Sequence, residues 1–73
     1  MSCADKLHNA RAIVSDLRVL GNALWSRFTG GKDGSLWYYR QLTDAFLRLG
    51  PRKLAEELDR TVLEMKSLAS RLD

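Results

Sequence analysis

Cysteine, histidine and proline are almost absent from this sequence, since each occurs once in 73 residues. One cysteine excludes an internal disulfide framework, and one cysteine with one histidine cannot supply the four ligands of a structural zinc site. Any histidine-based catalysis would depend on His8. A chain of this length buries only about 60% of its unfolded surface. Without a disulfide or a metal to add stability, we expect a homodimer or another oligomer.

Long apolar runs are also missing. No stretch approaches the roughly 20 apolar residues that span a membrane as a helix, so we expect no membrane partner. Asp5 and Lys6 lie where a signal peptide requires an apolar segment. The sequence therefore predicts a cytoplasmic protein, in which a single free thiol is ordinary.

The chain has no strong excess of one charge. Twelve basic and nine acidic side chains give a net charge of +3, and the two signs are interspersed in both halves. A nucleic-acid-binding protein usually concentrates lysine and arginine on one face, often between aromatic residues. This sequence has no such pattern, and we expect no nucleic-acid partner.

Helix signals cover nearly the whole chain. Apolar residues recur at intervals of three and four over 4–20, and Asn22 is expected to cap a short helical continuation to Phe28. A second helix is expected after a glycine-rich loop over 29–35, with Asp33 or Ser35 as its N-cap. Its apolar stripe comprises Leu36, Tyr39, Leu42, Phe46 and Leu49.

Gly50-Pro51 ends the second helix and begins the third, with glycine suited to the C′ position and proline to N1. The third helix is expected over 51–72, with Leu54, Leu63 and Leu68 widening its apolar stripe. The spacing of that stripe is typical of a coiled-coil-like seam, formed by Leu58, Val62, Met65, Ala69 and Leu72. The sequence thus predicts one all-α domain over 1–73, a small bundle of three main helices plus a short helical turn.

Polar residues that could form a site are concentrated in Ala4-Asp5-Lys6-Leu7-His8-Asn9-Ala10-Arg11. On a helix, Asp5, Asn9 and Asp16 fall on one side, with His8 beside them. These residues form either a solvated helix face or part of a site in which Asp5 binds a metal ion and Asn9 contacts a substrate. Hard cations such as Mg²⁺ or Mn²⁺ need several oxygen ligands, so Asp5 alone is insufficient.

This segment closely resembles the Ala-Asp-[Lys/Arg]-Leu-His-Asn-x-Arg motif of HD-domain metal-dependent phosphohydrolases. It is most similar to the branch that contains the (p)ppGpp hydrolase domains of the RelA/SpoT type. The residues at 23–28, 31–32 and 36–40 resemble the helical region that follows the motif in those proteins. The resemblance covers essentially the whole chain and implies the C-terminal part of a bacterial HD-domain fold.

The resemblance implies a role for each matching residue. Asp5 matches the last metal ligand of the family, and Asn9 matches the asparagine that contacts the nucleotide. Lys6 and Arg11 match basic residues on the nucleotide or phosphate side. His8 matches a motif histidine that does not bind the metal, so we expect it to hold the helix in place.

The family's His-Asp pair and a further histidine ligand lie upstream of the motif, and they have no counterpart in this chain. We therefore expect a truncated HD domain, carrying the C-terminal half of a phosphohydrolase that works by metal-assisted hydrolysis. We expect no catalytic residue, no activity and no tightly bound Mn²⁺ or Mg²⁺ in the isolated chain. Three alternatives stay open: natural truncation, a misplaced start codon, and an upstream half supplied by another chain.

A different class of function is a helical module for self-association or protein interaction. The coiled-coil-like seam of the third helix and the successive aromatics Trp37, Tyr38 and Tyr39 favour it. Three consecutive helical residues cannot all enter one core, so Trp37 or Tyr38 is expected to touch another surface. The glycine-rich loop lacks the spacing of a phosphate-binding P-loop, and Cys3 has no neighbour that would activate it.

Overall fold

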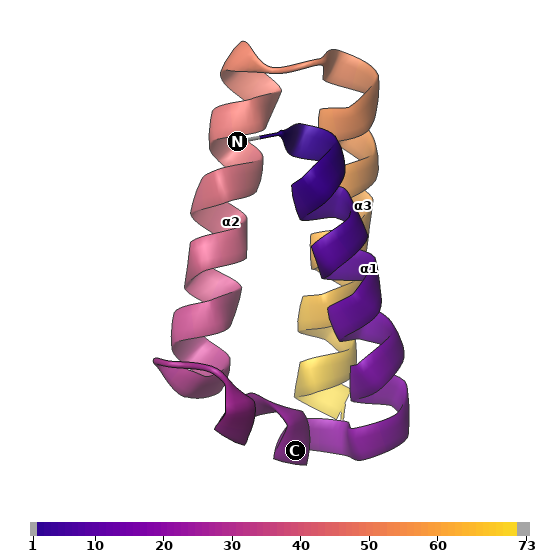
Figure 1. The fold of residues 1–73 in the computed structure, drawn as a ribbon, viewed down its shortest axis with the longest axis vertical. Helices are drawn as coiled ribbons and strands as arrows, with labels where there is room; N and C mark the ends of the chain where they lie inside the picture. Colours follow the sequence, from indigo (N-terminus) through magenta and orange to yellow (C-terminus); the bar gives the residue numbers. More distant parts are fainter. Residues whose placement is uncertain (1, 72–73) are drawn as a thin grey trace.

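Three α-helices and one 3₁₀ helix make up the computed structural model, which describes residues 2–71. They are α1 (Cys3–Leu20), η1 (Gly21–Arg27), α2 (Gly31–Leu49) and α3 (Arg52–Arg71). Figure 1 shows α1 and α3 running parallel, α2 running antiparallel to both, and η1 crossing one end of the bundle. The all-α fold with three main helices and a short helical turn is confirmed.

The core lies along α3, which packs against both α1 and α2. From α3 it takes five buried side chains at intervals of three and four: Ala55, Leu58, Val62, Met65 and Ala69. The predicted stripe of α1 is buried from Leu7 to Leu17, whereas Leu20 is 39% exposed. The α3 seam is confirmed as far as Ala69, and Leu72 lies outside the described residues.

Two ion pairs record the parallel register of α1 and α3. Arg11 Nη2 lies 3.4 Å from Glu57 Oε2. Two helical turns further along, Arg18 contacts Glu64. Each pair joins residues separated by 46 positions, as parallel helices in constant register require. Because all four side chains are at least 31% exposed, each pair contributes no more than about 1 kcal/mol.

The prediction of a loop over 29–35 is wrong for residues 31–35, which belong to α2. That helix begins at Gly31, and its N-cap is Gly30. Gly30 and Gly31 have φ values of 89° and 65°, which only glycine adopts readily, and they make the turn. The first turn of α2 contacts the rest of the fold. Lys32 Nζ donates to the Ala69 carbonyl of α3 at 3.2 Å, and Ser35 is buried. These tertiary contacts offset the helix-propensity cost of Gly34, about 1 kcal/mol.

The inward face of α2 also differs from the predicted apolar stripe. Tyr39 is buried as expected, but Leu49 is 88% exposed, and the small polar residues Ser35 and Thr43 are buried instead. Thr43 Oγ1 donates to the Tyr39 carbonyl at 2.7 Å, so its hydroxyl enters the core with a hydrogen-bond partner. Leu36, Leu42 and Phe46 pack at the edge of the core.

Gly50 is required between α2 and α3 for a reason other than the expected left-handed C′ geometry, since its φ is −99°. A Cβ atom at this position would lie 2.9 Å from Phe46 Cδ1 and 3.0 Å from the Phe46 carbonyl oxygen. Glycine is therefore selected by close approach to Phe46. Pro51 precedes the first residue of α3, and its carbonyl accepts the Ala55 N–H at 2.9 Å.

Leu58 tests whether α3 holds the bundle together. It is fully buried, so Leu58→Ala should lower the free energy of unfolding by about 2–5 kcal/mol, through lost burial and the cavity left behind. Leu49→Ala, at an exposed leucine, should change it by less than about 0.5 kcal/mol. Urea unfolding followed by circular dichroism measures both, and equal effects of the two substitutions would contradict the packing described.

Candidate functional site

The motif residues lie in the first two turns of α1. Cys3 and Leu7 point into the core and are 4% exposed, and Ala10 is fully buried. This inward spacing leaves Asp5, His8 and Asn9 on the solvent side of the helix. The expected polar row beside an apolar stripe is therefore present, and its side chains are open to solvent.

Asp5 and Asn9 lie one turn apart on the same face of α1, and Asp16 continues that face. Within residues 2–71, no described hydrogen bond or ion pair involves the side chain of Asp5 or Asn9. His8 is likewise exposed, and the described residues show no contact by which it holds the helix. The two side chains assigned to metal and nucleotide binding thus share an unobstructed surface.

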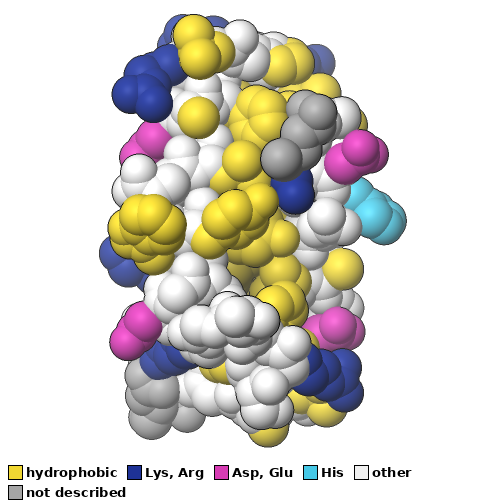
Figure 2. Space-filling view, turned by 60° about the vertical axis from the view of Figure 1, so that its left-hand side comes forward, with side chains coloured by type: hydrophobic (Ala, Val, Ile, Leu, Met, Phe, Trp, Pro, Cys, Tyr) yellow, Lys and Arg dark blue, Asp and Glu magenta, His cyan; other side chains and the backbone are white. Residues whose placement is uncertain are grey.

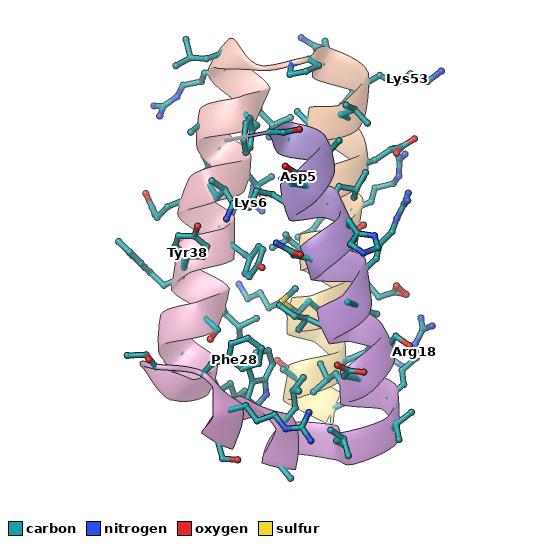
Figure 3. All side chains as sticks on the ribbon, in the orientation of Figure 1. Asp5, Lys6, Arg18, Phe28, Tyr38 and Lys53 are labelled. Atoms are coloured by element: carbon teal, nitrogen blue, oxygen red, sulfur yellow. The ribbon has the colours of Figure 1, made fainter. Side chains whose placement is uncertain are left out.

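Lys6 lies at the edge of this face and turns towards α2. Its Nζ is 5.8 Å from the centre of the Tyr38 ring, close enough for a cation–π interaction. Figure 3 shows Lys6 directed towards Tyr38, while Arg18 projects from the other side of α1. Lys6 therefore links the start of α1 to the middle of α2.

Arg11 lies on the opposite side of the polar row, where it pairs with Glu57 of α3. It lies five positions after Lys6, which places the two side chains about 140° apart around the helix axis. The structure therefore brings Asp5 and Asn9 together, with Lys6 next to them. Arg11 belongs to the α1–α3 boundary, in a shallow polar groove that also contains Ser15, Arg18 and Thr61.

The residues present do not complete a metal site. Among the described residues, no group of three histidine, cysteine, aspartate or glutamate side chains comes together. Asp5 offers one carboxylate, whereas Mg²⁺ or Mn²⁺ needs near-octahedral oxygen coordination. Within this part of the chain, Asp5 can contribute to a metal site but cannot form one.

A partly exposed ion network that the sequence analysis missed joins α2 to α3. Arg40 Nη2 is 2.8 Å from Asp44 Oδ1 and 2.9 Å from Asp59 Oδ1. Burial lowers the pKa of Arg40, but the hydrogen bonds to the two carboxylates outweigh it and raise the pKa overall. The four-residue spacing of Arg40 and Asp44 could have revealed one pair, but the pairing with Asp59 depends on the fold.

Cys3 is buried at the start of α1, and desolvation raises the pKa of its thiol. A raised pKa reduces the thiolate fraction at neutral pH, so the cysteine is poorly suited to nucleophilic chemistry. This agrees with a structural role for Cys3.

No protein-family model, curated protein or solved structure matches the chain. None of the helices in the described residues is long and apolar enough to cross a membrane. The resemblance to HD domains therefore rests on the sequence alone.

Tyr39 makes the stability of the bundle sensitive to alkaline pH. Burial raises the pKa of its phenol, and although the charge of Lys6 opposes this, the pKa stays above its ordinary value of 10.0. The folded state thus favours the neutral phenol, and its contribution is complete below pH 10. That contribution is lost as the pH rises from the unfolded pKa through the folded one.

We therefore expect Tyr39→Phe to lose less stability than the unmodified chain when the pH is raised from 9 to 11. Urea midpoints measured at both pH values test this, with Tyr38→Phe as the matched control on the more exposed neighbour. An equal pH dependence in the unmodified chain and in Tyr39→Phe would contradict the assignment.

Proposed function

We propose that this chain is the C-terminal half of an HD-family metal-dependent phosphohydrolase similar to the (p)ppGpp hydrolases. In this proposal Asp5 supplies one carboxylate ligand to a divalent metal site that other residues complete. Asn9 contacts the nucleotide, and Lys6 and Arg11 provide positive charge near it. The isolated chain is inactive because three of the family's four protein ligands are missing from it.

The observation that carries this proposal is the open Asp5–Asn9 face at the start of α1. Both side chains are exposed, lie one turn apart and have no described partner among residues 2–71. Lys6 is one residue away, yet it lies over the Tyr38 ring instead of forming a described ion pair with Asp5.

The arrangement of Lys6 also supports the proposal. Its Nζ lies between α1 and α2, and Lys6 is about 60° from Asn9 around the α1 axis. A long lysine side chain can leave a partly exposed aromatic ring at a cost of about 0.5–1 kcal/mol. Lys6 can therefore turn towards an anionic group held near Asn9. Arg11 would have to leave Glu57 to do the same.

We infer a second candidate function, a helical module for self-association or protein interaction. Figure 2 shows hydrophobic side chains in a band along the side of the molecule where α2 and α1 adjoin. Elsewhere on α2 and α3, Trp37 is 64% exposed and Leu63 is 51% exposed. Large exposed apolar side chains of this kind favour contact with another chain. The two functions are compatible, since a metal site completed by another polypeptide also requires a surface that binds that polypeptide.

The isolated chain should show no Mn²⁺-dependent release of pyrophosphate from (p)ppGpp. Mixing it with a second polypeptide that carries the upstream His-Asp half of an HD-domain hydrolase should produce that activity. In the mixture, Asp5→Asn should reduce the activity by about 100-fold or more, because a ligand is lost. Pyrophosphate release measured with and without Mn²⁺ provides the readout.

Asp16→Asn is the matched control, since Asp16 is another exposed aspartate further along the same face of α1. It should leave the activity of the mixture within about twofold of the unmodified chain. Two results would contradict the proposal: hydrolysis by the purified 73-residue chain alone, or equal loss of activity in Asp5→Asn and Asp16→Asn.

A further inference from the structure

A groove on the outer side of α2 and α3 is separate from the motif on α1. Its volume is about 200 Å³, and no α1 residue lines it. Leu36 and Val62 contribute apolar surface that is at least partly buried, while Trp37 and Leu63 are the exposed apolar side chains at its edges. Arg40 and Lys66 complete the lining. An exposed tryptophan beside an apolar groove is typical of the centre of a protein–protein interface.

One acidic and one basic side chain, Asp33 and Lys66, lie beside the groove at the same height along the helix axes. The contacts of Arg40 with Asp59 and of Lys32 with Ala69 define the antiparallel register of α2 and α3. In that register Asp33 on α2 lies at the level of Lys66 on α3. Both side chains are exposed, and neither has a described ion-pair partner within residues 2–71.

We propose that this groove is a homodimer interface, occupied by the same groove of a second copy of the chain. The proposal rests on the second candidate function above and names its surface. A two-fold axis parallel to the helices places α2 of each copy against α3 of the other at the same level. Trp37 then covers Leu63 of the partner subunit, and Asp33 meets Lys66 of the partner subunit.

Self-complementarity favours a second copy over a foreign partner. In this arrangement one apolar contact and one opposite-charge contact each form twice, as an isologous interface requires. Arg40 adds no unpaired positive charge, since it contacts the carboxylates of both Asp44 and Asp59. Arg48 and Arg52 lie at the far end of the same face. Glu56 lies 3.6 Å from Arg52, but one positive charge remains in excess there and limits close contact to the half of the helices around the groove.

Sedimentation equilibrium of the full chain from about 1 μM to 1 mM tests the proposal. The unmodified chain should form a dimer with a dissociation constant in the range of about 1–100 μM, typical of a small interface. Trp37→Ala should weaken the dimer by about 100-fold, because it removes the central aromatic side chain twice. Leu49→Ser, which removes a more exposed leucine outside the groove, should leave the dissociation constant unchanged.

A charge exchange tests the arrangement of the two copies. Asp33→Lys and Lys66→Asp should each weaken the dimer by about tenfold, because each places like charges together twice. The double variant should return to within about threefold of the unmodified chain. Asp16→Lys, on the far side of the molecule, is the control for net charge. Circular dichroism of every variant checks that the helices are retained.

Three results would overturn the proposal. A monomer at every concentration removes self-association altogether and leaves only protein interaction from the second candidate function. A dimer that Trp37→Ala does not weaken places the interface elsewhere and leaves that function standing. A double variant no tighter than the single ones excludes the stated pairing of Asp33 with Lys66. None of these results bears on Asp5, because the groove contains no α1 residue.

Discussion

The buried seam of α3 is the constraint on which the rest of the structure depends. Its five buried side chains are shared between α1, which lies parallel to it, and α2, which lies antiparallel. The chain has 73 residues and a single free cysteine, so it has no internal disulfide and can bury only a small apolar core. One helix therefore has to serve as the packing partner of both others. This arrangement holds the motif helix by its inner face and leaves its outer face free.

The helices that follow a regular apolar spacing could be predicted from the sequence. The apolar stripes of α1 and α3 are confirmed almost residue by residue. Leucine and valine at intervals of three and four form one face of a helix, and that face is buried when the helices pack. The start of α2 could not be predicted, since local glycine propensity favours a loop while contacts of Lys32 and Ser35 with the rest of the fold favour a helix. Thr43 was missed for a different reason: a polar residue is expected outside the core, but its hydroxyl has a hydrogen-bond partner within its own helix.

Less of the candidate site could be predicted. Motif matching identified Asp5 and Asn9, and helical geometry placed them on one face. The surroundings of Lys6 and Arg11 depend on Tyr38 and Glu57, which lie 32 and 46 positions further along the chain, and no local pattern reveals such contacts. As a result, four residues assigned to one site point in three directions, with Asp5 and Asn9 together and the two cations on either side.

The central claim is that the Asp5–Asn9 face of α1 belongs to a metal site completed by another polypeptide segment. Paramagnetic broadening of backbone amide NMR signals by Mn²⁺ tests it most directly, since the effect falls off steeply with distance from the ion. With the complementing His-Asp half present, substoichiometric Mn²⁺ should broaden the amides of the first two turns of α1. Asp5→Asn should abolish that broadening. Broadening centred on other acidic residues, or persisting in Asp5→Asn, would contradict the account.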